Sequence, residues 1–346
     1  MRTPAVRRAS SLRMSALDFD LVNASRRILE GSLSLVPGER AIVITDRERS
    51  ELIPALADIA GLTGARCDVL VLEELGARPF SSLPPAIEEA LAQAQASLLL
   101  IGFVEGEQPM RLRLLERVKE LGIRHAHMVG VTRRTMLAGF SVDPTRILDA
   151  TRAVRMRLRP NSKLHLRTPA GSDLHVTLDP AHRWAEHLGV IRPGRWENLP
   201  SGELMTSPES VEGVFVADAS AGGQFGAAAG VLSRTPIRLE IQGTTVKSVS
   251  SPDSSLQRGV EQFLSQERLC ARVGTIVLGT NVGILTPTGE LMCDQNLPVL
   301  HISLGSTFPD MTGAAPTTPH QLSLTCQASD VDLDGVPLLR AGRYMV

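Results

Sequence analysis

Hydrophobic residues follow one pattern in the first half of the chain and another in the second half. From residue 15 to residue 158, short and nearly continuous apolar runs alternate with segments whose apolar residues recur at helical spacing. Such runs are typical of buried parallel strands, and the segments between them are typical of amphipathic helices. The strand-like runs are RAIVITD (40–46), CDVLVLEE (67–74), SLLLIGFV (97–104) and HAHMVGV (125–131). We therefore predict an N-terminal α/β domain at residues 15–158, with a doubly wound parallel sheet.

The turns of this first half lack the glycine patterns of a nucleotide site. No Gly-x-Gly-x-x-Gly and no phosphate-loop motif follows any of the four strands. Because an α/β pattern alone does not imply a nucleotide, we reject a dehydrogenase. A helix is predicted from about Asp143, with an aspartate cap and Pro144 in the first turn, and it ends before Pro160. We expect this helix to join the two halves.

In the second half, apolar and polar residues alternate with a period of two. Two hairpins are predicted, SKLHLRTPAGSDLHVTLD (162–179) and PIRLEIQGTTVKSVS (236–250). Further strand-like runs follow at 272–279, 298–305, 320–326 and 330–339, and the clearest helix is at 252–268. The sequence therefore predicts a β-rich α+β domain at residues 159–346.

Composition and charge narrow the class of partner. The chain has 346 residues, 43% of them hydrophobic and 21% charged, with a formal net charge of -1. A near-neutral chain gives no electrostatic reason to bind a nucleic acid, and no run approaches the ~18 apolar residues that a membrane span requires. We expect neither partner.

Two features of the sequence, its cysteines and its N-terminal residues, indicate the cellular compartment. The four cysteines, Cys67, Cys270, Cys293 and Cys326, lie far apart and show no metal or redox spacing, so we expect buried free thiols and a cytoplasmic protein. Residues 1–14 are basic and rich in serine, without a following apolar stretch. We interpret them either as a disordered leader or as the result of a start codon assigned too early, with Met14 as the true start.

Five motifs in the second half occur in a recognisable order and spacing. They are TPAGSDL (168–174), ENLPSGELMTSP (197–208), LGTN (278–281), HISLGS (301–306) and VDLDGVPLLRAGR (331–343). In this order they resemble the aminopeptidase T family of cocatalytic metallopeptidases, whose 2,5-dihydroxypyridine dioxygenase relatives share the fold. The resemblance covers roughly residues 160–343 by motif and the first half by pattern. It implies an aminopeptidase T-type fold, with the cleft in the second domain, and a homodimer.

The resemblance also implies a set of site residues. Three of the family's metal-ligand positions map onto Glu203, His301 and His320, whereas three other positions of the family pattern, two acids and a tyrosine, are changed. Thr275 stands where the family has a second glutamate, Leu322 where it has the aspartate of a His-x-Asp motif, and Phe308 where it usually has a tyrosine. We take these six residues as the candidate binding cleft.

The loss of acids favours binding over hydrolysis. A pair of divalent cations needs bridging carboxylates, and Glu203 alone supplies too little negative charge, so we expect no two-metal peptidase site. Our first hypothesis is a non-catalytic peptide-binding protein without a cofactor, similar to the peptide-binding accessory proteins of ribosomal peptide natural product pathways such as crocagin biosynthesis. The protein would present a precursor peptide.

Two alternatives stay open. Glu203, His301 and His320 are a ligand set that suits one Fe, Zn or Mn ion, and the chain would then be a mononuclear oxygenase or hydrolase. In the other reading these residues are structural, since a histidine in an apolar run is commonly a hydrogen-bonded core residue and Glu203 is equally suited to a cap or an arginine pair.

Overall fold

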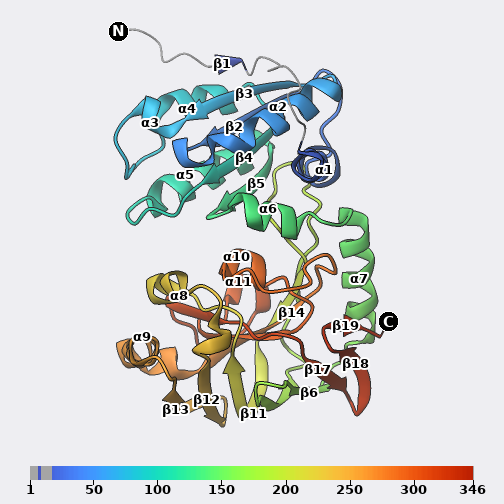
Figure 1. The fold of residues 1–346 in the computed structure, drawn as a ribbon, viewed down its shortest axis with the longest axis vertical. Helices are drawn as coiled ribbons and strands as arrows, with labels where there is room; N and C mark the ends of the chain where they lie inside the picture. Colours follow the sequence, from blue (N-terminus) through green and yellow to red (C-terminus); the bar gives the residue numbers. More distant parts are fainter. Residues whose placement is uncertain (1–6, 9–17, 346) are drawn as a thin grey trace. The chain divides into compact units, whose positions relative to one another are not determined.

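The computed structural model describes residues 7–8 and 18–345, and these form two compact units (Figure 1). The first unit comprises Met1–Thr145 together with Gly189–Pro200, and the second comprises Arg146–Leu188 together with Ser201–Val346. Apart from Arg7 and Arg8, the expected leader at residues 1–14 lies outside the described residues.

The division differs from the predicted boundary at residues 158 and 159. The segment Gly189–Pro200 belongs to the first unit because it adds a parallel strand beside the last strand of that unit. The residues from Arg146 onward belong to the second unit. Hydrophobic periodicity within a short segment does not show that a later strand pairs with an earlier domain, since that depends on contacts between distant segments.

The first unit is built on a six-stranded sheet with the order β1-β3-β2-β4-β5-β9. Neighbouring strands from β3 to β9 are parallel, and β1 is antiparallel to β3. This confirms the predicted doubly wound domain. The strands are β1 (Arg7–Arg8), β2 (Arg40–Thr45), β3 (Arg66–Val71), β4 (Ala96–Ile101), β5 (Arg124–Val129) and β9 (Trp196–Asn198).

Apolar residues cover both faces of this sheet, which explains the nearly continuous apolar runs. Ala41 and Val43 of β2 pack in a hydrophobic core on one face of the sheet. Ile42 and Ile44 pack in a second core on the opposite face. The helical elements are α1 (Phe19–Arg26), η1 (Arg27–Ser32), η2 (Arg47–Leu52), α2 (Ile53–Leu62), α3 (Leu72–Leu75), α4 (Pro85–Leu91), α5 (Gln108–Leu121) and α6 (Arg133–Gly139).

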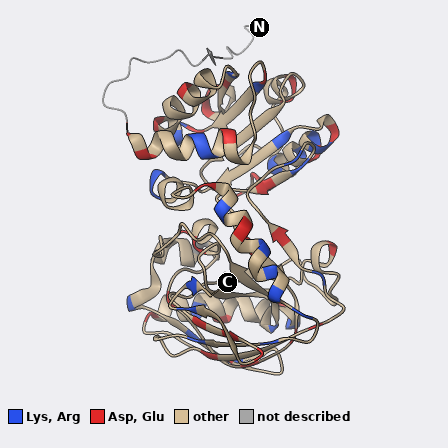
Figure 2. Ribbon diagram, turned by 90° about the vertical axis from the view of Figure 1, so that its right-hand side faces the viewer, with Lys and Arg blue, Asp and Glu red and all other residues tan. Residues whose placement is uncertain are grey.

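Helix α7 (Pro144–Arg157) is the helix predicted from Asp143. The Asp143 carboxylate accepts a hydrogen bond from the Thr145 amide at 2.9 Å, as a side chain at the start of a helix does. The helix carries one acidic residue, Asp149, and its basic residues are Arg146, Arg152, Arg155 and Arg157 (Figure 2).

The second unit consists of two antiparallel sheets, as the period-two pattern predicts. The five-stranded sheet has the order β16-β15-β14-β10-β8, and the eight-stranded sheet has the order β13-β12-β11-β7-β6-β17-β18-β19. The strands are β6 (Lys163–Arg167), β7 (Asp173–Leu178), β8 (Ala185–His187), β10 (Glu203–Thr206), β11 (Pro208–Ala217), β12 (Ile237–Gln242), β13 (Thr245–Ser250), β14 (Val273–Gly279), β15 (Leu300–Gly305), β16 (Gln321–Leu324), β17 (Asp330–Leu333), β18 (Val336–Arg340) and β19 (Arg343–Tyr344).

Both predicted hairpins form, as β6 with β7 and as β12 with β13. The helical elements of this unit are α8 (Gly223–Ala229), η3 (Leu232–Arg234), α9 (Ser254–Gln266), η4 (Arg268–Ala271), α10 (Leu291–Asp294) and α11 (Pro309–Thr312). All four cysteines are free thiols, three of them buried and Cys67 partly buried. No helix within the described residues combines the length and the apolar content needed to cross a bilayer.

Candidate functional site

The predicted cleft residues lie in and around the five-stranded sheet of the second unit. Strand pairing sets Met205 opposite Val277 and Val277 opposite His301, and it sets Ser303 opposite both Thr275 and Ser323. Because side chains alternate along a strand, these residues share one face. We call it the site face, and its residues with side chains are Ala185, His187, Glu203, Met205, Thr275, Val277, His301, Ser303, Gln321 and Ser323.

The opposite face of the same sheet is apolar and closed. Leu204, Ile276, Leu278 and Ile302 are fully buried there. Strand β11 of the eight-stranded sheet contacts β14, so this face lies within the interior of the second unit. Most polar side chains of the sheet therefore lie on the site face, while Glu186 and Thr206 lie on the opposite face.

Glu203 begins β10 on the site face, opposite His187 of β8 and Gly279 of β14. Its side chain is 13% exposed, and its Oε1 lies 3.9 Å from Nε2 of His187. Burial raises the pKa of Glu203 to about 7. A substantial fraction of this carboxyl group is therefore protonated at neutral pH, which weakens it as a metal ligand.

His301 lies in β15 and is 2% exposed. Its Nδ1 accepts a hydrogen bond from the Cys326 amide at 3.4 Å, which places the proton of the neutral ring on Nε2. Burial lowers the pKa of His301 to about 3, and the backbone carbonyl groups of Leu297 and Asp294 offset only part of that effect. The ring is therefore neutral at physiological pH. Nε2 is buried and has no hydrogen-bond partner among the residues that the structure describes.

Thr275 replaces a glutamate of the family pattern and provides a second unpaired polar group. The residue is fully buried, and within the described part of the chain its Oγ1 has no hydrogen-bond partner. A buried hydroxyl group without a partner costs about 1–3 kcal/mol. Two positions on the site face, His301 and Thr275, thus carry buried polar atoms for which the described residues provide no hydrogen-bond partner.

His320 and Leu322 are not among the residues of the site face. Leu322 pairs with Leu304 and lies on the apolar face, where it is fully buried, while His320 is exposed and precedes β16. The site face receives Gln321 and Ser323 instead, and the Gln321 amide nitrogen donates to Ser323 Oγ at 2.9 Å. The alternation in QLSL, with two leucines on one face, is the sequence signal that identifies them.

Phe308 packs against Ala185, Met205 and Val277 at the border of the site face. It also lines a cavity of about 480 Å³, whose wall includes Ser306 and Thr318. The family's tyrosine position therefore carries an apolar ring beside a hollow, without a hydroxyl group. This arrangement suits an apolar ligand group.

The residues do not fit either metal centre that the resemblance implies. Glu203 and His301 lie on strands separated by β14, and His320 is not on their face. Within the described chain, the three ligand groups that come within 4.8 Å of one another are those of His165, Asp173 and His175, in the other sheet. The nearby Asp294 is not free to substitute, because it accepts hydrogen bonds from the Thr288 and Gly289 amides and the Thr288 hydroxyl.

The carboxyl ends of the parallel strands in the first unit carry a network of ion pairs. In doubly wound folds ligands bind where the strand order reverses, which here is between β2 and β4. Asp46 follows β2, and its Oδ2 lies 3.0 Å from Arg78 and 3.1 Å from Arg49. Arg78 also contacts Glu107 at 2.6 Å. At the position where a nucleotide would bind, these charged side chains are therefore paired with one another.

Two solved structures share this fold over nearly the whole chain. The 2,5-dihydroxypyridine dioxygenase from Pseudomonas putida matches with a TM-score of 0.63 and 18% identity, over 96% of this chain and 99% of that chain. AmpT from Thermus thermophilus matches with a TM-score of 0.65 and 18% identity, over 96% and 100%.

The sequence comparisons are narrower. A 2,5-dihydroxypyridine 5,6-dioxygenase from Pseudomonas putida is 40% identical over 68 residues, which are 19% of this chain and 19% of that protein. The sequence match thus spans about a fifth of the length of this curated relative. No protein-family model matches the chain. The predicted resemblance in fold is confirmed: the chain has the fold that aminopeptidase T and the dihydroxypyridine dioxygenase share.

Proposed function

We propose that this chain is a non-catalytic peptide-binding protein on an aminopeptidase T-like scaffold. One observation carries the proposal: the strands of the site face present few acidic side chains. Thr275 stands where the family pattern has a glutamate, Gln321 and Ser323 are neutral, and Glu203 is the acid among the strand residues of this face.

The charge balance argues against a two-metal centre. Two divalent ions about 4 Å apart repel by about 17 kcal/mol at an effective dielectric constant of about 20. Bridging carboxylates offset this repulsion in two-metal sites. Glu203 supplies at most one negative charge here, and its raised pKa of about 7 reduces even that. The neutral ring of His301 adds none.

The same groups suit a peptide. The Nε2–H of His301 makes no hydrogen bond of good geometry within the described residues, although the carbonyl groups of Leu297 and Asp294 lie near the ring, and a peptide carbonyl oxygen is a suitable acceptor. The Thr275 hydroxyl can donate or accept, so it can pair with either backbone group. Phe308 and the adjoining cavity offer an apolar surface for a side chain. A ligand site usually combines an apolar hollow with a few hydrogen-bonding groups, and the hollow at Phe308 has the hydroxyl groups of Ser306 and Thr318 in its wall.

The more specific form of the proposal is that the ligand is a precursor peptide in natural product biosynthesis. It is supported by the loss of ligand residues on a scaffold that aminopeptidase T shares. The chain would then hold the peptide for other proteins of the pathway, as a cytoplasmic homodimer.

The second candidate is a mononuclear metal enzyme that uses Glu203, His301 and His320. The sequence match to the dioxygenase favours it. The placement of the three residues does not, because His320 is exposed and lies off the site face.

The two candidates are separated by binding and metal measurements on the full chain. We expect peptides with apolar residues to bind in titration calorimetry without being cleaved, and chelator to leave the affinity unchanged. The Thr275→Val variant should bind more weakly, whereas Thr177→Val, on the other sheet, should not. Release of N-terminal residues with added cobalt or zinc would contradict the proposal. So would near-stoichiometric metal that is lost in a His301→Ala and His320→Ala double variant.

A further inference from the structure

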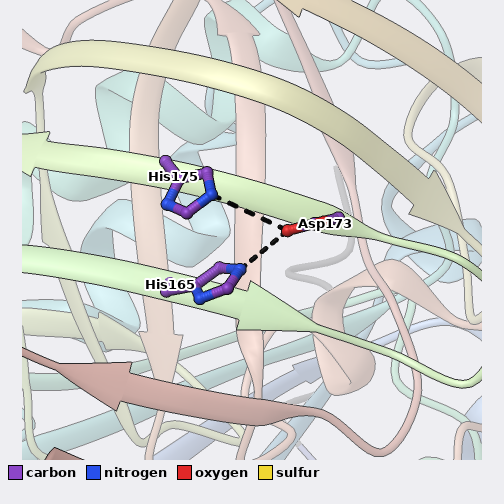
Figure 3. Close-up of side chains that lie close together, drawn as sticks. All are labelled: His165, Asp173 and His175. Carbon is purple, nitrogen blue, oxygen red and sulfur yellow. Dashed lines mark hydrogen bonds and ion pairs between the residues drawn. The ribbon is translucent and has the colours of Figure 1, made fainter. Parts of the chain in front are cut away.

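Three potential metal ligands lie together on the outer surface of the eight-stranded sheet. His165 is in β6, and Asp173 and His175 are in the adjacent strand β7 (Figure 3). Strand pairing sets His165 directly opposite His175, and Asp173 shares the face of His175 two residues earlier. The neighbouring positions Leu164, Leu166, Leu174 and Val176 are buried on the inner face.

The geometry of the three side chains is close to that of a coordination site. Nε2 of His165 lies 2.7 Å from Oδ1 of Asp173, and Nε2 of His175 lies 3.8 Å from the same oxygen. The two imidazole rings are stacked, with centroids 4.1 Å apart and an interplanar angle of 17°. One ligand atom from each residue falls within 4.8 Å of the other two. The edges of a tetrahedron around a zinc ion are about 3.4 Å long at the usual bond lengths, so small movements would suffice.

The scaffold holds these side chains in place. Strands β6 and β7 lie in the middle of the sheet, between β17 and β11. Sites built on such paired strands are more precise than sites on loops. The hydrogen bond from His165 lowers the pKa of Asp173, so the carboxylate is ionised at neutral pH.

The charges around the cluster partly cancel. Arg167 lies opposite Asp173 in the β6–β7 pair, and it pairs with Asp332 at 2.7 Å. Glu212 lies opposite His175 on the other side and adds a negative charge. The ion would therefore approach a site whose nearest arginine is already engaged by a carboxylate.

We propose that His165, Asp173 and His175 bind a divalent transition-metal ion of the borderline class, such as Zn²⁺, Ni²⁺ or Cu²⁺. Two imidazole nitrogens and one carboxylate oxygen match the preferences of these ions, whereas Mg²⁺ and Ca²⁺ prefer sites made of oxygen. Water completes the coordination, since the side chains of Asp173 and His175 are 68% and 63% exposed. On binding, metal bonds replace the hydrogen bond between His165 and Asp173, the proton on Nε2 of His165 passes to water while Nδ1 carries the ring proton, and the ion links β6 to β7. This site is independent of the proposed peptide site.

The test uses the metals alone with the chelator-treated full chain. Titration with Zn²⁺ should show one equivalent bound, and Asp173→Asn and His175→Ala should each lose at least about tenfold in affinity. Thr177→Val, on the same face of β7, should bind like the wild type. The Cu²⁺ complex should show hyperfine coupling to two imidazole nitrogens in electron paramagnetic resonance, reduced to one in His175→Ala.

Equal Zn²⁺ affinity in the wild type, Asp173→Asn and His175→Ala would overturn the proposal. Asp173→Asn preserves the shape of the side chain, so it keeps the test valid if His175→Ala does not fold. Metal that is lost on mutation of His301 and His320 but kept in these variants would overturn it as well.

Discussion

Ser303 and Ser323 face each other across β15 and β16, with their hydroxyl groups hydrogen-bonded. This contact establishes which side of β16 faces the candidate site. Ser323 and Gln321 lie on the side of His301, and Leu322 lies on the other side. The position that the family motif assigns to an aspartate is therefore a core position in this chain.

The first prediction tests that orientation. Leu322→Ala should destabilise the protein by about 2–5 kcal/mol, because it removes a fully buried leucine from the apolar face. Gln321→Ala, at an exposed position of the same strand, should cost less than about 1.5 kcal/mol. Urea unfolding measures both. Similar small losses for the two variants would contradict the assignment.

Thr275→Val should separate stability from binding. The valine removes a buried hydroxyl group that has no partner, so the free energy of unfolding should rise by about 1 kcal/mol. Peptide affinity should fall at the same time, because the site loses a hydroxyl group that would form a hydrogen bond with the peptide. Lower stability together with unchanged affinity would show that the hydroxyl group is not part of the site.

Glu203 should make the stability depend on pH. Its folded pKa of about 7 lies above the unfolded value of about 4.3, so the folded state keeps a proton that the unfolded state has lost. Stability due to this group is therefore present at low pH and is lost as pH rises from about 4.3 to 7. The difference in free energy of unfolding between Glu203→Gln and the wild type should shift in favour of the variant by up to about 3 kcal/mol as pH rises from 4.5 to 8. Parallel unfolding profiles of the two proteins would contradict this.

Gly279 should be intolerant of a side chain. A Cβ atom there would lie 1.8 Å from the carbonyl oxygen of Leu297, in the segment that precedes β15 and His301. We expect Gly279→Ala to destabilise the protein by at least about 3 kcal/mol, since backbone atoms must move. Gly61→Ala, in helix α2 with open space around it, should instead stabilise by about 0.5–1 kcal/mol. Thermal unfolding compares the two variants.

The ion-pair network of the first unit should be sensitive to the loss of one partner. Glu107 is 1% exposed and accepts hydrogen bonds from Nε and Nη2 of Arg78 at 2.8 and 2.6 Å. Glu107→Gln should cost about 3–5 kcal/mol, because the buried guanidinium loses its main counter-charge. Glu116→Gln, in an exposed pair with Arg113, should cost less than about 1 kcal/mol. A cost below 1 kcal/mol for both would contradict a structural role of the network.

Local patterns were sufficient for much of the fold. The apolar runs at residues 40–46, 67–74, 97–104 and 125–131 are parallel strands, and the two predicted hairpins are present. These features depend on the period of a short segment, which the sequence displays directly. The shortage of acids at the mapped ligand positions was inferred from the family resemblance, which compares residue types position by position and requires no coordinates.

Only the tertiary structure decided which side chains meet. The assignment of Gln321 and Ser323 to the site face, in place of His320 and Leu322, depends on how β16 pairs with β15. The contact of His165 with Asp173 and His175 depends on the β6–β7 register, and the place of Gly189–Pro200 depends on its pairing with β5. A shift of one residue in pairing turns every side chain of a strand to the other face, and that choice is made by distant partners. The chain alone therefore specified the elements and their charges, whereas long-range pairing specified the sites.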